Sequence, residues 1–342
     1  MDTKLHRSVR FLKSTQQGAL ILALLVVTSC SGRQSSASLL LGGDVILARS
    51  GTPVFDVSAA TQSPWEDVAR ISTVNTTDVF AVNLESPFGV MPPGLPVEQA
   101  EMNLCAPSDT AEIIQLMGID LATTANNHSA DCAQDDRLNT EAVLSAAGIV
   151  TLPHPGATEV DTPTGEKIFF VAINDYSGTY ELESLKKQIQ ASRQQSDLVV
   201  VSIHWGMEYQ GGPSKREEKL ARELVEAGAD VIWGHHPHVL RRMEWMTSSM
   251  DGHRALVLYS LGNLLTDQFM LDDTSQTALV RLDFHDHRID KVTVFPLVMS
   301  QKELKVALVK DADIMNMITD RLNLEEMKES GVEIVLWSPV IK

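Results

Sequence analysis

Hydrophobic and polar positions alternate in blocks along most of the chain. Short, nearly continuous apolar runs recur between residues 38 and 261, and segments with helical periodicity separate them. Apolar runs of this kind are typical of strands that are covered on both faces of a sheet. The pattern therefore predicts an α/β fold rather than segregated helical and strand regions.

The clearest predicted helix covers residues 214–227. Ser214 is a candidate N-cap residue, Gly228 is a candidate C′ residue, and the apolar stripe between them consists of Leu220, Ala221, Leu224 and Val225. The sequence also predicts helices at residues 182–193 and 108–117. A predicted strand follows each helix. Residues 230–233 follow the helix at 214–227, residues 197–203 follow the helix at 182–193, and residues 119–123 follow the helix at 108–117.

The pattern changes towards the C-terminus. Residues 277–298 predict two strands joined by a turn, and we interpret His285 and His287 as solvated hairpin residues rather than metal ligands. Residues 301–342 contain one amphipathic helical segment and a predicted strand at 332–336. We expect a main domain at residues 38–300 and a C-terminal extension, 301–342, that packs on it.

The N-terminus has the features of a secretory signal. Four basic side chains precede an uncharged apolar run at residues 19–27, which is too short to span a bilayer as a mature helix. The run ends in Val27-Thr28-Ser29-Cys30, which resembles the bacterial lipoprotein box. We expect a signal peptide at residues 1–29, lipidation of Cys30 and a polar tether at 30–37; the alternative is an ordinary cleaved signal with an incidental cysteine.

The charge balance is strongly acidic. The formal net charge is −17, and it becomes −20 without residues 1–29, which carry four basic and one acidic side chain. This balance argues against nucleic acid as a partner, because phosphate contacts need lysine and arginine. Beyond Cys30 the chain has Cys105 and Cys132. They form a disulfide in an oxidising compartment, or remain two buried thiols.

Ligand-type side chains stand where predicted strands end. The most informative run, His235-His236-Pro237-His238, directly follows an apolar strand, and imidazoles are ligands for zinc, manganese, iron or nickel. Other strand endings carry Asp44, Glu85, Asn126-Asn127-His128 and His204. Because ligands bind outside the carboxyl ends of strands in open α/β sheets, we expect these five endings to converge on one metal site.

These motifs together resemble the CapA-type poly-γ-glutamate capsule synthesis family, over about residues 38–270. The motifs are Gly43-Asp44-Val45, Asn83-Leu84-Glu85-Ser86-Pro87, Ala125-Asn126-Asn127-His128, His204-Trp205-Gly206-Met207-Glu208-Tyr209, Gly234-His235-His236-Pro237-His238-Val239 and Tyr259-Ser260-Leu261-Gly262-Asn263. That family resembles the calcineurin-like metallophosphoesterases. The resemblance implies a four-layer α/β/β/α sandwich.

The resemblance also implies roles for single residues. It assigns His128 to contact with the substrate or protonation of the leaving oxygen, and it assigns metal binding to Asp44, Glu85, Asn127, His204, His236 and His238. Two divalent cations, of manganese, iron or zinc, would stabilise the attacking and leaving oxygens of a displacement. One departure is Asp44-Val45-Ile46, which lacks the histidine of the usual Asp-x-His motif.

Further polar residues near these motifs are candidates for the pocket or for support of the ligands. They are Asn126, His235, Glu208, Tyr209, Asn263, Asp267 and Gln268. All of these except Asn126 and His235 have an alternative role, in turn capping and ordinary hydrogen bonding.

The resemblance implies a lipid-anchored protein of the bacterial cell envelope, facing the periplasm or the exterior. We expect a metal-dependent hydrolase that acts in synthesis, export or processing of an anionic polymer such as poly-γ-glutamate, with capsule synthesis or export machinery as partners. Two alternatives stay open. One is a general envelope metallophosphoesterase for small phosphoesters, and the other is a non-catalytic, polymer-binding assembly subunit.

Overall fold

The computed structural model describes residues 36–55, 64–74, 77–133 and 136–337. The predicted signal peptide, Cys30 and most of the predicted tether lie outside these residues. Within them, no helix has the length and hydropathy needed to cross a bilayer.

The first sheet contains the strands that carry Asp44 and Glu85. Its order is β16-β15-β14-β1-β4-β5-β6, while β13 pairs with β1 and β17 pairs with β15. Strands β1, β4, β5 and β6 are parallel, whereas β14 runs antiparallel to β1. The bounds are β1 Ala37–Val45, β4 Val79–Leu84, β5 Leu121–Thr123, β6 Val150–Leu152, β13 Asn263–Leu265, β14 Gln276–His285, β15 Arg288–Ser300, β16 Lys305–Leu308 and β17 Glu333–Leu336.

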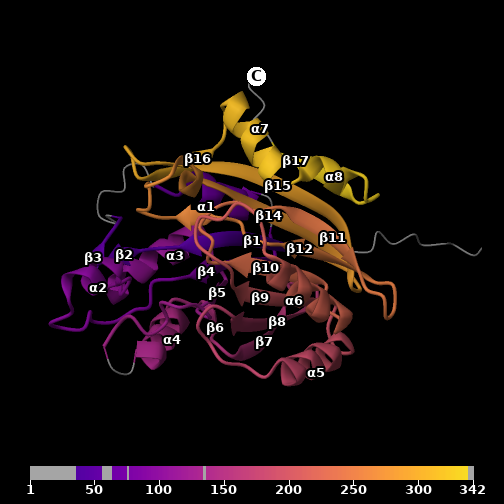
Figure 1. The fold of residues 1–342 in the computed structure, drawn as a ribbon, viewed down its shortest axis with the longest axis horizontal. Coiled ribbons are helices and arrows are strands. Elements are labelled where there is room, and N and C mark those ends of the chain that lie inside the picture. The colour runs from indigo at the N-terminus through magenta and orange to yellow at the C-terminus, as the bar shows by residue number, and fades with distance from the viewer. Residues whose placement is uncertain (1–35, 56–63, 75–76, 134–135, 338–342) are drawn as a thin grey trace, which may run out of the picture. The chain divides into compact units, whose positions relative to one another are not determined.

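The second sheet carries the histidine-rich strand endings. Its order is β11-β12-β10-β9-β8-β7 (Figure 1). Strands β12, β10, β9 and β8 are parallel to one another, and the two outer strands are antiparallel to their neighbours. The bounds are β7 Gly156–Asp161, β8 Lys167–Asn174, β9 Leu198–His204, β10 Val231–His235, β11 Met243–Thr247 and β12 Arg254–Leu258. A separate small ribbon joins β2 Ala48–Arg49 to β3 Thr52–Pro53.

The two sheets pack face to face, and helices cover their outer faces. Leu39 and Leu41 of β1 share one apolar cluster with Val200 of β9 and Trp233 of β10. The neighbouring Leu40 faces the other way, into a cluster with α1 (Glu66–Val74) and α3 (Ala111–Met117), because side chains alternate along a strand. Helices α5 (Leu182–Arg193) and α6 (Lys215–Glu226) cover the second sheet. The α/β class is confirmed, and the layers run helix, sheet, sheet, helix.

The helices have these bounds: α1 Glu66–Val74, α2 Val97–Met102, α3 Ala111–Met117, α4 Asp136–Ala146, α5 Leu182–Arg193, α6 Lys215–Glu226, α7 Ala312–Arg321 and α8 Leu324–Lys328, with 3₁₀ turns η1 Ser108–Thr110 and η2 Asp272–Ser275. The predicted helix at 214–227 is confirmed as α6. Ser214 and Glu217 form a reciprocal capping box at its start. Gly228 follows it with a φ of 108°.

Three local expectations have clear outcomes. Cys105 and Cys132 form a disulfide, with Cα atoms 4.9 Å apart. The hairpin is confirmed as β14 and β15, but His287 is not solvated at its tip, because its Nδ1 atom bonds Asp230 Oδ2 at 2.7 Å. The predicted C-terminal helix is two helices, since the backbone turns at Asn323, which has a φ of 59°.

Candidate metal centre

Asp44 stands at the end of β1, where the chain passes very close to its neighbour. The Asp44 amide donates to Gly262 O at 2.9 Å, and a Cβ atom on the preceding Gly43 would lie only 1.9 Å from that same oxygen. Glycine is therefore required at position 43. This close approach places the Asp44 carboxylate in the fully buried space between the ends of the sheets.

Asn83 and Glu85 lie at the end of β4, beside Asp44. The Asn83 amide Nδ2 donates to Asp44 Oδ1 at 2.7 Å and to Glu85 Oε1 at 3.3 Å. One neutral amide therefore bridges two buried carboxylates. Glu85 Oε2 has no hydrogen-bond partner among the described residues, although it is buried.

The segment after β5 brings in Asn126, Asn127 and His128. Asn126 Nδ2 donates to Asn83 Oδ1 at 3.1 Å and to Leu84 O at 2.8 Å. Asn126 thus fixes the backbone of the site rather than lining a pocket. Asn127 Oδ1 instead lies 2.6 Å from His204 Nε2, in the direction of the second sheet.

The second sheet supplies the histidines. His204 ends β9, and His235 ends β10 beside it in register. The residues after β10 turn sharply, because His236 and His238 have φ angles of 94° and 58°. Such angles are unfavourable for residues with a Cβ atom. The turn brings the His238 imidazole to the carboxylates of the first sheet and the His236 ring beside that of His204.

The imidazoles lie within a few ångströms of one another and of the two carboxylates. His238 Nδ1 is 3.4 Å from Asp44 Oδ2, and His238 Nε2 is 3.8 Å from Glu85 Oε2. His204 Nδ1 is 3.8 Å from Glu85 Oε1. The rings of His204 and His236 have centroids 4.7 Å apart. All six residues that the sequence suggests as ligands therefore come together.

Two groups of side chains could hold a metal ion within the described part of the chain. One is Asp44, Glu85 and His238, and the other is Glu208, His236 and His238. Unpartnered buried atoms fit this assignment: Glu85 Oε2, His204 Nδ1 and both ring nitrogens of His236 have no hydrogen-bond partner among the described residues. Buried polar atoms are normally satisfied, and a bound cation would satisfy these.

Burial keeps three of the imidazoles in the site neutral, as metal binding requires. Burial lowers the pKa of His235 and His236 to about 4, and it lowers the pKa of His204 well below its ordinary value. Neutral imidazoles offer lone pairs to a metal. Burial raises the pKa of Glu85 to about 7. His238 differs, because Glu85 and Asp44 outweigh its burial and raise its pKa to about 10.

His128 is held by a carboxylate that sequence reasoning missed. His128 Nδ1 lies 2.9 Å from Asp131 Oδ2, and the same oxygen accepts from Leu104 N at 2.7 Å. Burial lowers the pKa of His128, but the hydrogen bond with Asp131 and the charge of Glu85 raise it by more. The imidazole is therefore set up to carry a proton close to the candidate ligands.

The remaining predicted residues make different contacts around the ligands. Asn263 Oδ1 lies 2.9 Å from His238 Nδ1, and Gln268 in turn accepts from Asn263. Asp267 instead pairs with Arg49. His235 is buried against Trp233, with Nδ1 3.6 Å from Asp44 Oδ1. Tyr209 lies over His238, with ring centroids 6.2 Å apart.

Sequence reasoning also missed Asn83 and Tyr176. Asn83 stands two positions before Glu85 in the same motif, so the alternation of a strand could have placed both side chains on one side. Tyr176, whose ring centroid lies 4.1 Å from that of His236, follows β8 without any distinctive motif. Nothing in the local sequence pattern identifies it.

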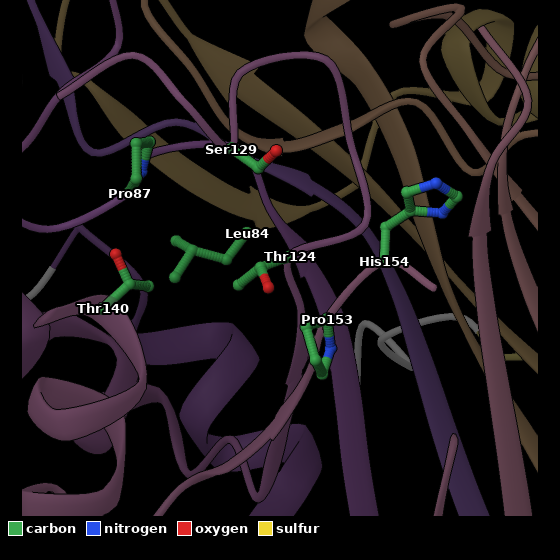
Figure 2. Close-up of a pocket in the computed structure, with 7 residues that line it drawn as sticks. All are labelled: Leu84, Pro87, Thr124, Ser129, Thr140, Pro153 and His154. Carbon is green, nitrogen blue, oxygen red and sulfur yellow. The ribbon is translucent and has the colours of Figure 1, made fainter. Parts of the chain in front are cut away.

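A small cavity lies beside this centre. Figure 2 shows its lining, which includes Ser129, Thr124 and His154 together with Leu84 and Pro153. Its lining has no carboxylate, and its volume is about 60 Å³. His154 Nδ1 accepts from the Asn174 amide at 2.9 Å. The cavity therefore has room for little more than ordered water.

Comparison with known proteins gives matches over most of the chain. Residues 38–162 and 154–268 match the family described as bacterial capsule synthesis protein PGA_cap. The capsule biosynthesis protein CapA of Bacillus anthracis is 30% identical over 264 residues, which are 69% of this chain and 62% of that protein. The PGA biosynthesis protein CapA of Bacillus subtilis is 26% identical over 315 residues, covering 84% of this chain and 79% of that protein.

A solved structure of a hypothetical protein from Thermus thermophilus is 14% identical, with a TM-score of 0.49 over 76% of this chain and 98% of that one.

The family match extends over both strand sets that meet at the candidate metal centre, from Asp44 to Asn263. The chain belongs to the family of bacterial capsule synthesis proteins.

Proposed function

We propose that this protein is a metal-dependent hydrolase that acts on an anionic capsule polymer of the poly-γ-glutamate type. The observation that carries the proposal is the convergence of Asp44, Glu85, Asn127, His204, His236 and His238 with unpartnered buried ligand atoms. The polymer comes from the names of the family and of the Bacillus relatives. A cationic centre would also attract an anionic chain locally, although the protein has a net charge of −17.

One set of residues would bind the cations, and His128 would donate a proton. Asp44, Glu85, Asn127 and the imidazoles of His204, His236 and His238 would hold the divalent cations, which would supply Lewis-acid stabilisation and a water of lowered pKa. His128, oriented by Asp131, would give a proton to the leaving group as a general acid. Burial of the centre excludes bulk water and strengthens these electrostatic effects.

The first test measures metal and turnover together. Purified protein would be reconstituted with manganese, iron or zinc, analysed by elemental mass spectrometry, and assayed for hydrolysis of poly-γ-glutamate. The variant His236→Ala/His238→Ala should lose both metal and turnover. A matched control, His253→Ala/His285→Ala, removes two histidines elsewhere and should keep both. Turnover by metal-free protein, or no metal in any reconstitution, would rule out the proposal.

One observation favours a second candidate function. Ile46, fully buried and apolar, occupies the position where the metallophosphoesterase resemblance expects a metal-binding histidine. A centre that holds fewer cations would serve a non-catalytic subunit that docks the polymer through its carboxylates. Stoichiometric metal with polymer binding but without hydrolysis would favour this function over the enzyme.

Lipid anchoring at Cys30 and an envelope location are part of the same proposal. They rest on the basic and apolar residues before Val27-Thr28-Ser29-Cys30. In cells, Cys30→Ser should abolish incorporation of labelled fatty acid and move the protein out of the membrane fraction. Cys30→Ser protein that stays in the membrane fraction would contradict the anchor and leave the metal centre unaffected.

A further inference from the structure

A cavity of about 600 Å³ lies against the metal centre on the side of α6. Tyr176 belongs to its lining and packs on His236, with ring centroids 4.1 Å apart. Gly206 and Met207, also in the lining, come directly before Glu208 of the second candidate ligand group. Its volume falls within the roughly 300–1,000 Å³ typical of ligand pockets. A substrate bound at the cations can therefore extend into this space.

The inner wall of the cavity is fixed by a fully buried arginine. Arg241 donates to Met207 O at 3.0 Å and to Gln210 O at 2.7 Å, and it pairs with Glu217 Oε1 at 2.6 Å. Gly206 has a φ of 87°, and a Cβ atom there would lie 2.5 Å from the same Glu217 oxygen. The loop after β9 is thus held in one conformation before any ligand arrives, which reduces the entropic cost of binding.

The edge of the cavity carries an exposed but oriented cation. The Arg216 side chain is 66% exposed, whereas its partner Asp175 is 2% exposed. Asp175 accepts from Arg216 Nη2 at 2.8 Å and from Tyr180 Oη at 2.6 Å, and it also contacts Arg216 Nη1. A guanidinium has five N–H donors, so this pair leaves donors that face solvent. Arg216 can bind a second carboxylate without giving up Asp175.

Exposed nonpolar surface completes the cavity. Met207 is 68% exposed and Tyr176 is 54% exposed, although both are large hydrophobic side chains. The cavity thus offers nonpolar surface between the metal centre and a fixed guanidinium. A γ-glutamyl unit has the matching chemistry, because it contains an amide, two methylene groups and a free α-carboxylate.

We propose that this cavity is a subsite for the γ-glutamyl segment next to the bond held at the metal centre, with Arg216 binding an α-carboxylate of that segment. Tyr176 and Met207 contact its methylene groups. The inference rests on the proposed function, since it assumes a γ-linked polymer as the substrate. Arg216 determines specificity for a segment with a free α-carboxylate, and it does not touch the reacting bond.

Binding by calorimetry tests the subsite without relying on turnover. Manganese-loaded protein would be titrated with a short γ-linked glutamate oligomer and with the same oligomer carrying α-amides. Arg216→Gln should weaken binding of the acidic oligomer about tenfold, the effect of losing one charged hydrogen bond. Met207→Glu should weaken it similarly through charge repulsion. Arg222→Gln, an exposed arginine of α6 outside the lining, is the matched control and should change nothing.

The α-amide oligomer completes a double-mutant cycle, and its binding should not change in Arg216→Gln. Equal affinity of the wild type and Arg216→Gln for the acidic oligomer would overturn the subsite while leaving the proposed function intact. Equal losses for both oligomers would also overturn it. A wild type that neither binds nor hydrolyses the acidic oligomer, while it hydrolyses a small aryl phosphodiester, would overturn both proposals.

Discussion

His128 and Asp131 form a hydrogen-bonded pair, with Nδ1 and Oδ2 2.9 Å apart, at the edge of the candidate metal centre. The pair is close to the disulfide, since Asp131 precedes Cys132 and also accepts from the amide of Leu104, which precedes Cys105. A short stretch of chain thus links the orientation of one imidazole to a covalent cross-link.

Asp131→Asn should lower kcat by roughly 100-fold at unchanged KM, within the range of general acid catalysis. The asparagine can still accept a hydrogen bond, but it no longer stabilises a protonated His128 by charge. Metal content should stay unchanged, which elemental analysis would check. Asp161→Asn, at an exposed position, is the matched control. A wild-type kcat for Asp131→Asn would show that the pair has no part in turnover.

The Cys105–Cys132 disulfide should make a large contribution to stability. It closes a loop with a sequence separation of 27 residues, and the entropy model gives about 3–4 kcal/mol for a loop of that length. The free energy of unfolding of Cys105→Ser/Cys132→Ser should therefore be lower by that amount. The variant should unfold at a lower denaturant concentration than the wild type. The wild type measured with reductant should match the variant. Equal stability of oxidised and reduced wild type would contradict this expectation.

Asn83 should matter most when the protein lacks metal. Asn83→Leu removes the amide that donates to both Asp44 and Glu85 and leaves two buried carboxylates side by side. We expect a loss of about 1–3 kcal/mol in the free energy of unfolding of chelator-treated protein. Reconstitution with metal should recover part of the loss, because the cation again separates the two charges. A loss of the same size with and without metal would contradict this electrostatic account.

His287 should give the protein a pH-dependent stability away from the metal centre. Burial lowers its pKa, but the hydrogen bond with Asp230 and the charge of Asp230 raise it above 6.5 overall. The folded state then binds its proton more tightly than the unfolded state does. The contribution is complete below pH 6.5 and is lost as the pH rises through the folded-state pKa.

The corresponding experiment compares urea unfolding of wild type and His287→Gln from about pH 6 to about pH 9, a range that spans the expected loss. The difference in unfolding free energy between them should shrink as the pH rises. His285→Gln, on the same hairpin, provides the control for loss of a neighbouring histidine. A difference in unfolding free energy that grows with pH would contradict a raised pKa of His287 in the folded state.

The sequence by itself determined the class of fold and the identity of the candidate ligands. Apolar runs with helical segments between them predicted the α/β class, and capping residues such as Ser214 placed α6 nearly to the residue. Asp44, Glu85 and His236 could be selected because ligand-type side chains after apolar strands are a local pattern. The histidines of the hairpin show the limit of that reasoning, since the contact of His287 with Asp230 joins residues 57 positions apart.

Only the tertiary structure decided how those residues meet. Asp44 and Glu85 end strands of one sheet, whereas His204 and His235 end strands of the other, and the packing of the two sheets brings the four endings together. Asn83, Asp131 and Tyr176 acquire their relation to the site through contacts that depend on this packing. The same holds for the cavity beside α6, whose Arg216 is oriented by Asp175 from the loop after β8, 41 positions away. Local sequence records which side chains are present, but distances between such segments are set by how the sheets bury their apolar faces against each other.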